Sequence, residues 1–162
     1  MISYSQLFAP SSAVESKARK VMVRLANRPL RRLPQGGPLV DYSLNDFSLR
    51  IPVSHPLPRI LATDANYLKP LTMLAEAVSA AGSTGTAIDV GANIGDTAVL
   101  MGQAGLTKVL CVEGNPTFLP VLRTNADRAS RRGWTLEVVA HFVGTNDSES
   151  PVRLETKGGT AT

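Results

Sequence analysis

The chain has little of several residue types that organise other classes of protein. Its 162 residues include one cysteine and two histidines, which excludes a disulfide framework and a Cys/His zinc site. Aromatic residues make up only 5%, so the core must consist mainly of Val, Leu, Ile and Ala, as in a sheet covered by helices. No apolar run approaches the roughly 18 residues that span a bilayer. We therefore expect a cytoplasmic α/β protein without a membrane span, with the Cys111 thiol buried and reduced.

Positive charge is scarce outside the N-terminal third. Residues 1–50 carry a net charge of +5, whereas residues 51–162 carry −1. A nucleic-acid groove needs basic residues throughout the folded part, so we expect no nucleic-acid partner. Residues 11–28 have the spacing of a basic amphipathic helix, either a solvated arm or a membrane-surface or transit segment. With the Pro- and Gly-rich residues 29–38, they predict a division into an arm at 1–40 and a domain at 41–162.

The domain shows a change of periodicity along the chain. Residues 41–53 alternate as short strands do, and the two prolines of H-P-L-P (55–58) predict extended chain rather than helix. A helix is expected from about Asn66 to Gly82. Strand, helix and strand then alternate with short connections, which predicts parallel pairing and right-handed crossovers. The expected strands are 86–90, 108–113, 136–144 and 151–156, the first two of them buried, and the expected helices are 95–105 and 116–130.

The stretch I-D-V-G-A-N-I-G-D-T (88–97) follows the first of these strands, at the sheet edge where ligands bind in such folds. Gly91 permits a sharp turn, and Gly95 permits close approach of the helix start. A phosphate ligand fits poorly, because the stretch lacks G-K-[ST], its spacing is G-x-x-x-G, and Asp89 would repel phosphate oxygens.

Two acidic residues favour a different ligand. Asp89 suits an ammonium group, while the following helix N-terminus suits a carboxylate, so the pair matches an amino acid. Glu113, 24 residues later, ends the next strand and is placed to accept both hydroxyls of a ribose. An amino acid joined to a ribose without phosphate is S-adenosylmethionine. Each residue also has an alternative interpretation when it is considered alone: Asp89 as a turn or helix-capping residue, and Glu113 as a solvated residue at a strand end.

These residues also resemble a known family. D-V-G-A-N-I-G-D-T (89–97), V-E-G-N-P (112–116) and L-R-T-N (122–125) are similar to the FkbM-type S-adenosylmethionine-dependent methyltransferases, over roughly residues 46–162. The resemblance implies a Rossmann-like methyltransferase sheet and O-methylation of a sugar or secondary-metabolite hydroxyl on a small molecule. It implies that Glu113 holds the ribose and that the methionine end is lined by Asp89, Gly91, Ala92, Asn93 and Gly95.

The sequence departs from that family in two places. Gly114 stands where the family usually has proline, which would loosen the turn after Glu113. The Asp-x-Glu-Gly-type motif and the strands that follow it are missing, so we expect an incomplete sheet and the N-terminal part of a truncated domain. No catalytic base can be assigned. His141, after the third strand, lies near the expected adenine position, where it either stacks on the base or packs at the surface.

Two other functions remain open at this stage. One is an NAD-dependent oxidoreductase fragment, which would use the same first half of the fold. The other is a non-catalytic remnant that binds a partner through its basic arm. The sequence predicts neither the oligomeric state nor the acceptor.

Overall fold

The computed structural model describes residues 37–82, 86–144, 156–157 and 160–161. The chain divides into two compact units at Pro70/Leu71, and each is described by itself. The expected basic helix at 11–28 and most of the expected strand at 151–156 lie outside the described residues. The predicted boundary at residue 40 stays a prediction. Within the described part, no helix is long and apolar enough to cross a membrane.

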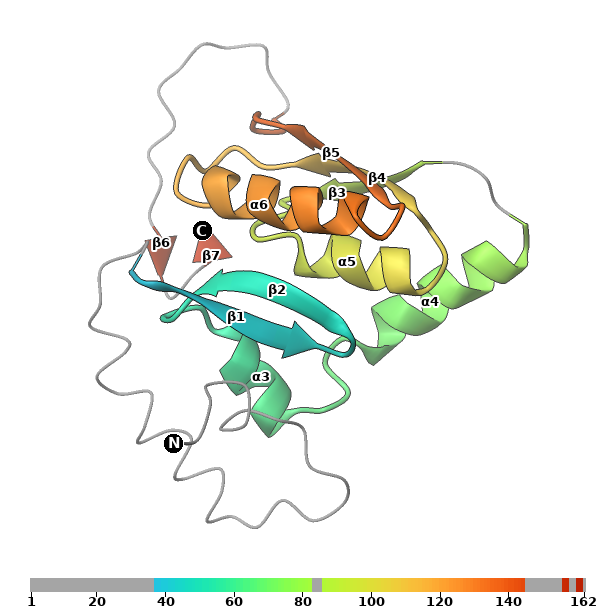
Figure 1. The fold of residues 1–162 in the computed structure, drawn as a ribbon, viewed down its shortest axis with the longest axis horizontal. Coiled ribbons are helices and arrows are strands. Elements are labelled where there is room, and N and C mark those ends of the chain that lie inside the picture. Colours follow the sequence, from blue (N-terminus) through green and yellow to red (C-terminus); the bar gives the residue numbers. More distant parts are fainter. Residues whose placement is uncertain (1–36, 83–85, 145–155, 158–159, 162) are drawn as a thin grey trace. The chain divides into compact units, whose positions relative to one another are not determined.

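The first unit contains a β-hairpin of β1 (Leu39–Leu44) and β2 (Phe47–Pro52) (Figure 1). Asn45 adopts φ 54° in the connecting turn, a left-handed conformation that asparagine tolerates better than most residues. The antiparallel register places Tyr42 opposite Leu49 and Leu44 opposite Phe47. All four side chains are buried, which confirms the strands expected from the alternation of residues 41–53.

Helix α3 (Leu57–Thr63) contradicts the prediction of extended chain at 55–58. Pro56 is the N-cap residue and Pro58 lies in the first turn, where a missing N–H has no helical partner to lose. The Leu57 N–H donates to His55 Nδ1 at 3.3 Å, which satisfies a donor of that first turn. The two prolines thus begin a helix instead of preventing one.

Helix α4 (Lys69–Ala80) begins three residues later than expected. Pro70 is its second residue, as the tolerance of proline in a first turn requires. After Ala80 the chain turns at Gly82 (φ 76°), whose N–H donates to the Ser79 carbonyl at 3.0 Å.

The second unit contains a three-stranded parallel sheet in the order β3-β4-β5, which confirms the expected α/β class and parallel pairing. A two-stranded antiparallel pair is formed by β6 (Thr156–Lys157) and β7 (Thr160–Ala161). The elements of the sheet region are β3 (Ala87–Val90), α5 (Asp96–Gln103), β4 (Lys108–Val112), α6 (Leu119–Ser130) and β5 (Thr135–Val139).

Two boundaries in this sheet differ from the predictions. Helix α6 begins at Leu119 instead of Pro116, because Asn115 Oδ1 accepts the Thr117 N–H at 2.9 Å and holds a separate turn. The expectation that Pro120 distorts this helix was wrong, because Pro120 falls in the first turn, where proline is tolerated. Strand β5 ends at Val139, five residues before the predicted end.

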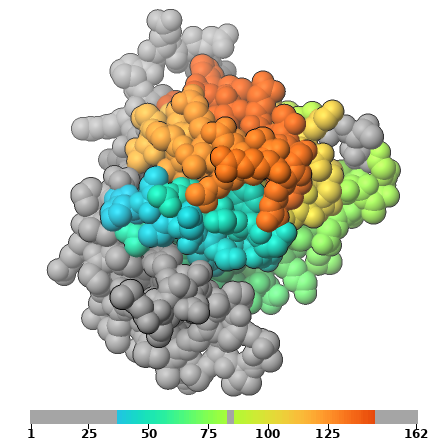
Figure 2. Space-filling view, in the orientation of Figure 1, coloured from blue at the N-terminus to red at the C-terminus, as the bar shows by residue number. Residues whose placement is uncertain are grey.

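Helices α5 and α6 cover the same face of the sheet, with α5 packed on β4 and α6 on β5 (Figure 1). The side chains of α6 and β5 form a continuous orange surface in Figure 2. The covered face includes Val109, Cys111 and Leu136, all buried. Burial raises the pKa of Cys111 to about 12, and the charge of Asp89 adds to the effect. The thiol is therefore buried, as expected, and its environment disfavours the reactive thiolate.

The opposite face of the sheet is open. Ile88 and Val90 of β3 are 62% and 60% exposed, and Val139 of β5 is 37% exposed. The prediction that β3 is a buried strand was therefore wrong: Ile88 and Val90 are exposed, and Ala87 and Asp89 are only half-buried. An apolar run is compatible with burial on both faces, but the helices α5 and α6 of the described residues cover only one of them.

Candidate functional site

Glu113 is the most firmly held side chain at the carboxyl edge of the sheet. It follows β4 directly and is 7% exposed. One carboxylate oxygen accepts the Asn93 N–H at 2.7 Å and the other accepts the Asn115 N–H at 2.6 Å. A carboxylate has about four acceptor positions, so one on each oxygen remains for a ligand. These two hydrogen bonds fix the orientation of the carboxylate in advance.

The backbone at Glu113 also joins the ends of two strands. Its N–H donates to the Val139 carbonyl at 3.0 Å, and its carbonyl accepts the His141 N–H at 3.1 Å. The segment that follows β5 is thereby brought against the end of β4.

The glycine loop lies against the same edge. The Gly91 and Ala92 N–H groups both donate to the Val112 carbonyl, at 2.8 and 3.1 Å. Gly91 has φ 78°, and a Cβ there would meet no atom within 4 Å, so backbone conformation is what requires glycine. Asn93 also has positive φ, at 51°, which directs its N–H to Glu113.

Two residues of this loop are structural. Ala92 is buried, and its carbonyl accepts the Gly95 N–H at 2.7 Å. Gly95 has φ 84°, and a Cβ there would lie 2.8 Å from Leu122 Cδ1. The close approach expected of Gly95 is thus made to helix α6.

Asp89 lies on the covered face of β3, opposite Cys111 in the register. Its Oδ2 accepts a hydrogen bond from Thr97 Oγ1 of helix α5. Burial raises the pKa of Asp89; the Thr97 hydrogen bond lowers it, and the charge of Glu113 raises it. Asp89 therefore joins β3 to α5 behind the loop.

Asp96 modifies the prediction for the helix N-terminus. Burial raises its pKa to about 6, hydrogen bonds from the Asp96 and Thr97 N–H groups oppose the shift, and the charge of Asp89 adds to it. The first-turn donors expected to receive a ligand carboxylate are thus already hydrogen-bonded to a carboxylate of the chain itself.

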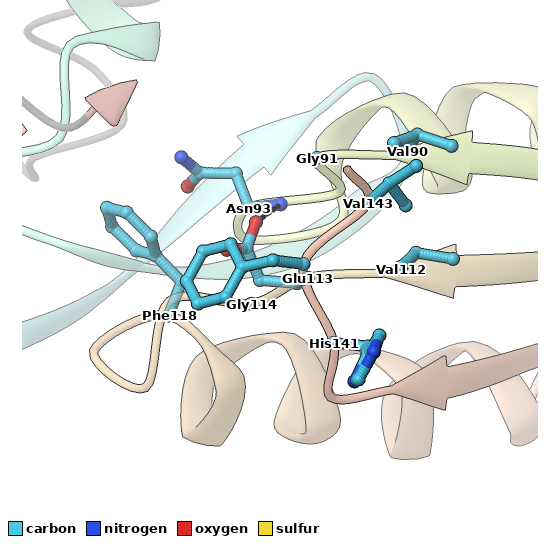
Figure 3. A pocket seen from close by; sticks show the side chains of 10 residues that line it. Val90, Gly91, Asn93, Val112, Glu113, Gly114, Phe118, His141 and Val143 are labelled. Carbon is cyan, nitrogen blue, oxygen red and sulfur yellow. Dashed lines mark hydrogen bonds between the residues drawn. The ribbon is translucent and has the colours of Figure 1, made fainter. Parts of the chain in front are cut away.

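A cavity of about 330 Å³ lies along this edge, within the size range of small-molecule sites. Four of the seven predicted site residues line it: Gly91, Asn93, Glu113 and His141. Figure 3 shows Gly91, Asn93 and Glu113 close together at the strand ends. Asp89, Ala92 and Gly95 lie outside the lining. The remaining lining residues are Val90, Val112, Gly114, Phe118, Phe142 and Val143.

His141 lines the cavity through a side chain that stands apart from Asn93 (Figure 3). The residue is exposed, and its N–H is hydrogen-bonded to the carbonyls of Glu113 and Val139. Its backbone therefore has a clear role in joining the strand ends. Whether the imidazole stacks on a ligand stays a prediction.

Several residues that shape the site were not predicted. Val90 and Val112 end their strands, so the strand positions themselves were an available signal.

Asn125, fully buried in α6, donates from Nδ2 to the Ile94 carbonyl at 2.8 Å and so fixes the position of the glycine loop. Sequence spacing gave no signal for this contact across 31 residues, although L-R-T-N belongs to the resemblance. Buried Asn115 Nδ2 has no hydrogen-bond partner within the described part.

Comparisons with family models, curated proteins and solved structures find no match to this chain. Among the described residues, no group of three or more His, Cys, Asp or Glu side chains is arranged to hold a metal ion.

Proposed function

We propose that the protein binds S-adenosylmethionine at the carboxyl edge of the β3-β4-β5 sheet and is a methyltransferase acting on a small-molecule hydroxyl. The single observation that carries the proposal is the orientation of Glu113. Two backbone N–H groups hold its carboxylate, and one acceptor position on each oxygen remains beside the cavity. Such a pre-oriented carboxylate can accept hydrogen bonds from both hydroxyls of a ribose.

The charges around the cavity favour a cationic ligand over a pyrophosphate. Glu113 lines the cavity, and Asp89 lies close enough behind it for the charge of Glu113 to raise the pKa of Asp89. No Lys or Arg is among the described residues that line the cavity. A nicotinamide dinucleotide would bring two phosphate charges against these carboxylates, whereas S-adenosylmethionine brings a sulfonium and an ammonium.

The fit is better at the ribose end than at the amino-acid end. Because Asp96 occupies the first-turn N–H groups of α5, the ligand carboxylate would not lie at that helix terminus. The backbone of Gly91 and Asn93 lines the cavity there instead. This sheet edge would position the cofactor, which when bound supplies an electrophilic methyl group for transfer to an acceptor oxygen. The methyltransferase assignment itself rests on the FkbM-type resemblance.

Calorimetric titration of the chain with S-adenosylhomocysteine, S-adenosylmethionine and NAD tests this proposal. We expect saturable binding of the first two ligands, and at least tenfold weaker binding by Glu113→Gln, because a hydrogen bond from a ligand hydroxyl to a charged acceptor contributes about 1.5–3 kcal/mol. Glu137→Gln is the matched control, since Glu137 is an exposed residue of β5 outside the cavity lining.

Saturable binding of NAD without binding of S-adenosylhomocysteine would overturn the proposal in favour of a dinucleotide-dependent enzyme. Equal affinities of Glu113→Gln and Glu137→Gln for S-adenosylhomocysteine would show that Glu113 does not hold the ribose.

A further inference from the structure

The residue after Glu113 carries a contact that neither the sequence patterns nor the proposed function uses. A Cβ placed on Gly114 would overlap Cγ, Cδ1 and Cε1 of Phe142. The aromatic ring therefore rests on the Gly114 backbone, in the space that a side chain would occupy. Any other residue at position 114 would displace the ring, so glycine here has a packing role and does not merely loosen the turn.

The ring is held on one side and open on the other. The hydrogen bond from the His141 N–H to the Glu113 carbonyl (3.1 Å) places Phe142 beside the end of β4. Phe142 nevertheless remains 41% exposed, and it lines the same cavity as Glu113. An aromatic ring supported from below by backbone and open above is a preformed stacking surface.

The position of this surface follows from the covalent structure of a nucleoside. The base is attached directly to the ribose, so a ribose held by Glu113 brings its base close to the residues that surround Glu113. Gly114, with Phe142 resting on it, is the next residue along the chain. This step rests on the proposed function, because it takes the ribose to be bound at Glu113.

The rest of this end of the cavity is apolar. Val112, Phe118 and Val143 line it, and among the described lining residues other than Glu113 two carry polar side chains, Asn93 and His141. Hydrogen-bonding side chains that could read the edge of a base are therefore scarce. Stacking on an aromatic ring, in contrast, tolerates any base.

We propose that Phe142, seated on Gly114, is the stacking platform for the nucleoside base of the ligand, and that the base is bound by stacking with little discrimination at its edge. The site then discriminates strongly between ligands at the ribose and the amino-acid group, and only weakly between different purine bases. A pocket with few hydrogen-bonding side chains cannot strongly reject an analogue that differs in one exocyclic group.

Calorimetry with S-adenosylhomocysteine and S-inosylhomocysteine, in which an oxo group replaces the amino group of the base, tests both parts. We expect the wild-type chain to bind the two within about tenfold of each other. Phe142→Ala should weaken both by roughly ten- to one-hundredfold, since base–aromatic stacking is lost. Phe142→Tyr should retain wild-type affinity. Tyr67→Ala is the control, because it removes an aromatic ring that is 53% exposed and lies outside the cavity lining.

Gly114→Ala provides a second, independent perturbation. This variant keeps the ring of Phe142 but fills the space above the backbone of residue 114 in which the ring packs. It should therefore weaken S-adenosylhomocysteine binding about as much as Phe142→Ala. The double variant should bind no more weakly than either single variant, since residues in direct contact are not additive. Circular dichroism and thermal melts check that each variant is folded.

The outcomes separate this inference from the proposed function. Absence of S-adenosylhomocysteine binding by the wild-type chain overturns both. Wild-type binding that is weakened by Glu113→Gln but unchanged by Phe142→Ala overturns the platform alone. A loss of more than about one hundredfold for S-inosylhomocysteine relative to S-adenosylhomocysteine shows edge recognition and overturns the proposed tolerance.

Discussion

The two faces of the β3-β4-β5 sheet have similar sequences but opposite environments. On the covered face, Val109 and Cys111 are 1% and 0% exposed, while Ile88 and Val90 on the other face are 62% and 60% exposed. Both faces are rich in β-branched and aliphatic residues, so residue type does not separate them. The difference depends on where the two helices lie.

The direction of the crossovers explains the placement of those helices. The sheet order β3-β4-β5 means that both connections advance the chain in the same direction. Right-handed crossovers that advance in one direction put their helices on one face. Two helices therefore lie over one face, where Val109, Cys111 and Leu136 are buried, and among the described residues they leave Ile88 and Val90 of the other face exposed.

The largest expected effect comes from truncating equal-sized side chains on the two sides. Leu122 is fully buried under the covered face, against Gly95. Leu122→Ala should lower the free energy of unfolding by about 3 kcal/mol, whereas Ile88→Ala, which removes the same number of carbon atoms, should cost less than about 1 kcal/mol. Urea titration measures both, and equal losses would contradict the contrast between the faces.

A second effect concerns the charge buried at the start of α5. Because burial raises the pKa of Asp96 from 3.8 to about 6, the folded state holds the proton more strongly, and the contribution of Asp96 to stability falls as pH rises from about 4 to 6. Two pKa units correspond to about 3 kcal/mol, and we expect about 2 kcal/mol because the side chain is only partly shielded from solvent.

The variant Asp96→Asn should lack this dependence. The difference in unfolding free energy between Asp96→Asn and wild type is expected to shift in favour of the variant between pH 4 and 6 and then to level off. Urea titrations at half-unit pH steps measure it. A difference that is constant across this range would show that Asp96 titrates normally.

A smaller effect tests the packing of α5 against the start of β5. A Cβ on Gly102 would lie 2.7 Å from Trp134 Cε3 and 2.8 Å from Cδ2. Gly102→Ala should cost about 1 kcal/mol, since overpacking of about 2 kcal/mol is partly offset by the better helix propensity of alanine. Trp134 is the only tryptophan, so a changed emission spectrum reports its displacement directly. Unchanged emission and stability would contradict the contact.

The smallest expected effect concerns the open face. Ile88→Thr keeps a β-branched residue in β3 and should change the unfolding free energy by less than about 0.5 kcal/mol. It should also lower self-association, because β3 is an edge strand of its sheet and Ile88 is exposed on it. Static light scattering at several concentrations compares the two chains. A cooperative loss of stability would show that this face is packed in solution.

Much of this edge of the sheet was predictable from local patterns. The β-branched runs ending at Val90 and Val112 predicted two parallel strands, and the acidic residue after the second predicted a side chain at the site. Glu113 indeed lines the cavity. Helix beginnings were less accurate, because the side chain of Asn115 caps a turn at 115–117 instead of α6. Prolines at positions 56 and 58 are compatible with extended chain and also with the first turn of a helix. The sequence pattern predicted extended chain, whereas in the structure a helix begins after Pro56.

The sequence by itself determined the α/β class, the parallel order of strands and helices, and the glycine and acidic residues at the strand ends, because these follow from short-range periodicity and backbone preference. Tertiary structure decided which of those residues line the cavity, because the Asn93 N–H group reaches Glu113, and the ring of Phe142 reaches Gly114, only after the strands are paired. It also decided which face of each apolar strand is buried, because burial depends on the packing of helices against the sheet.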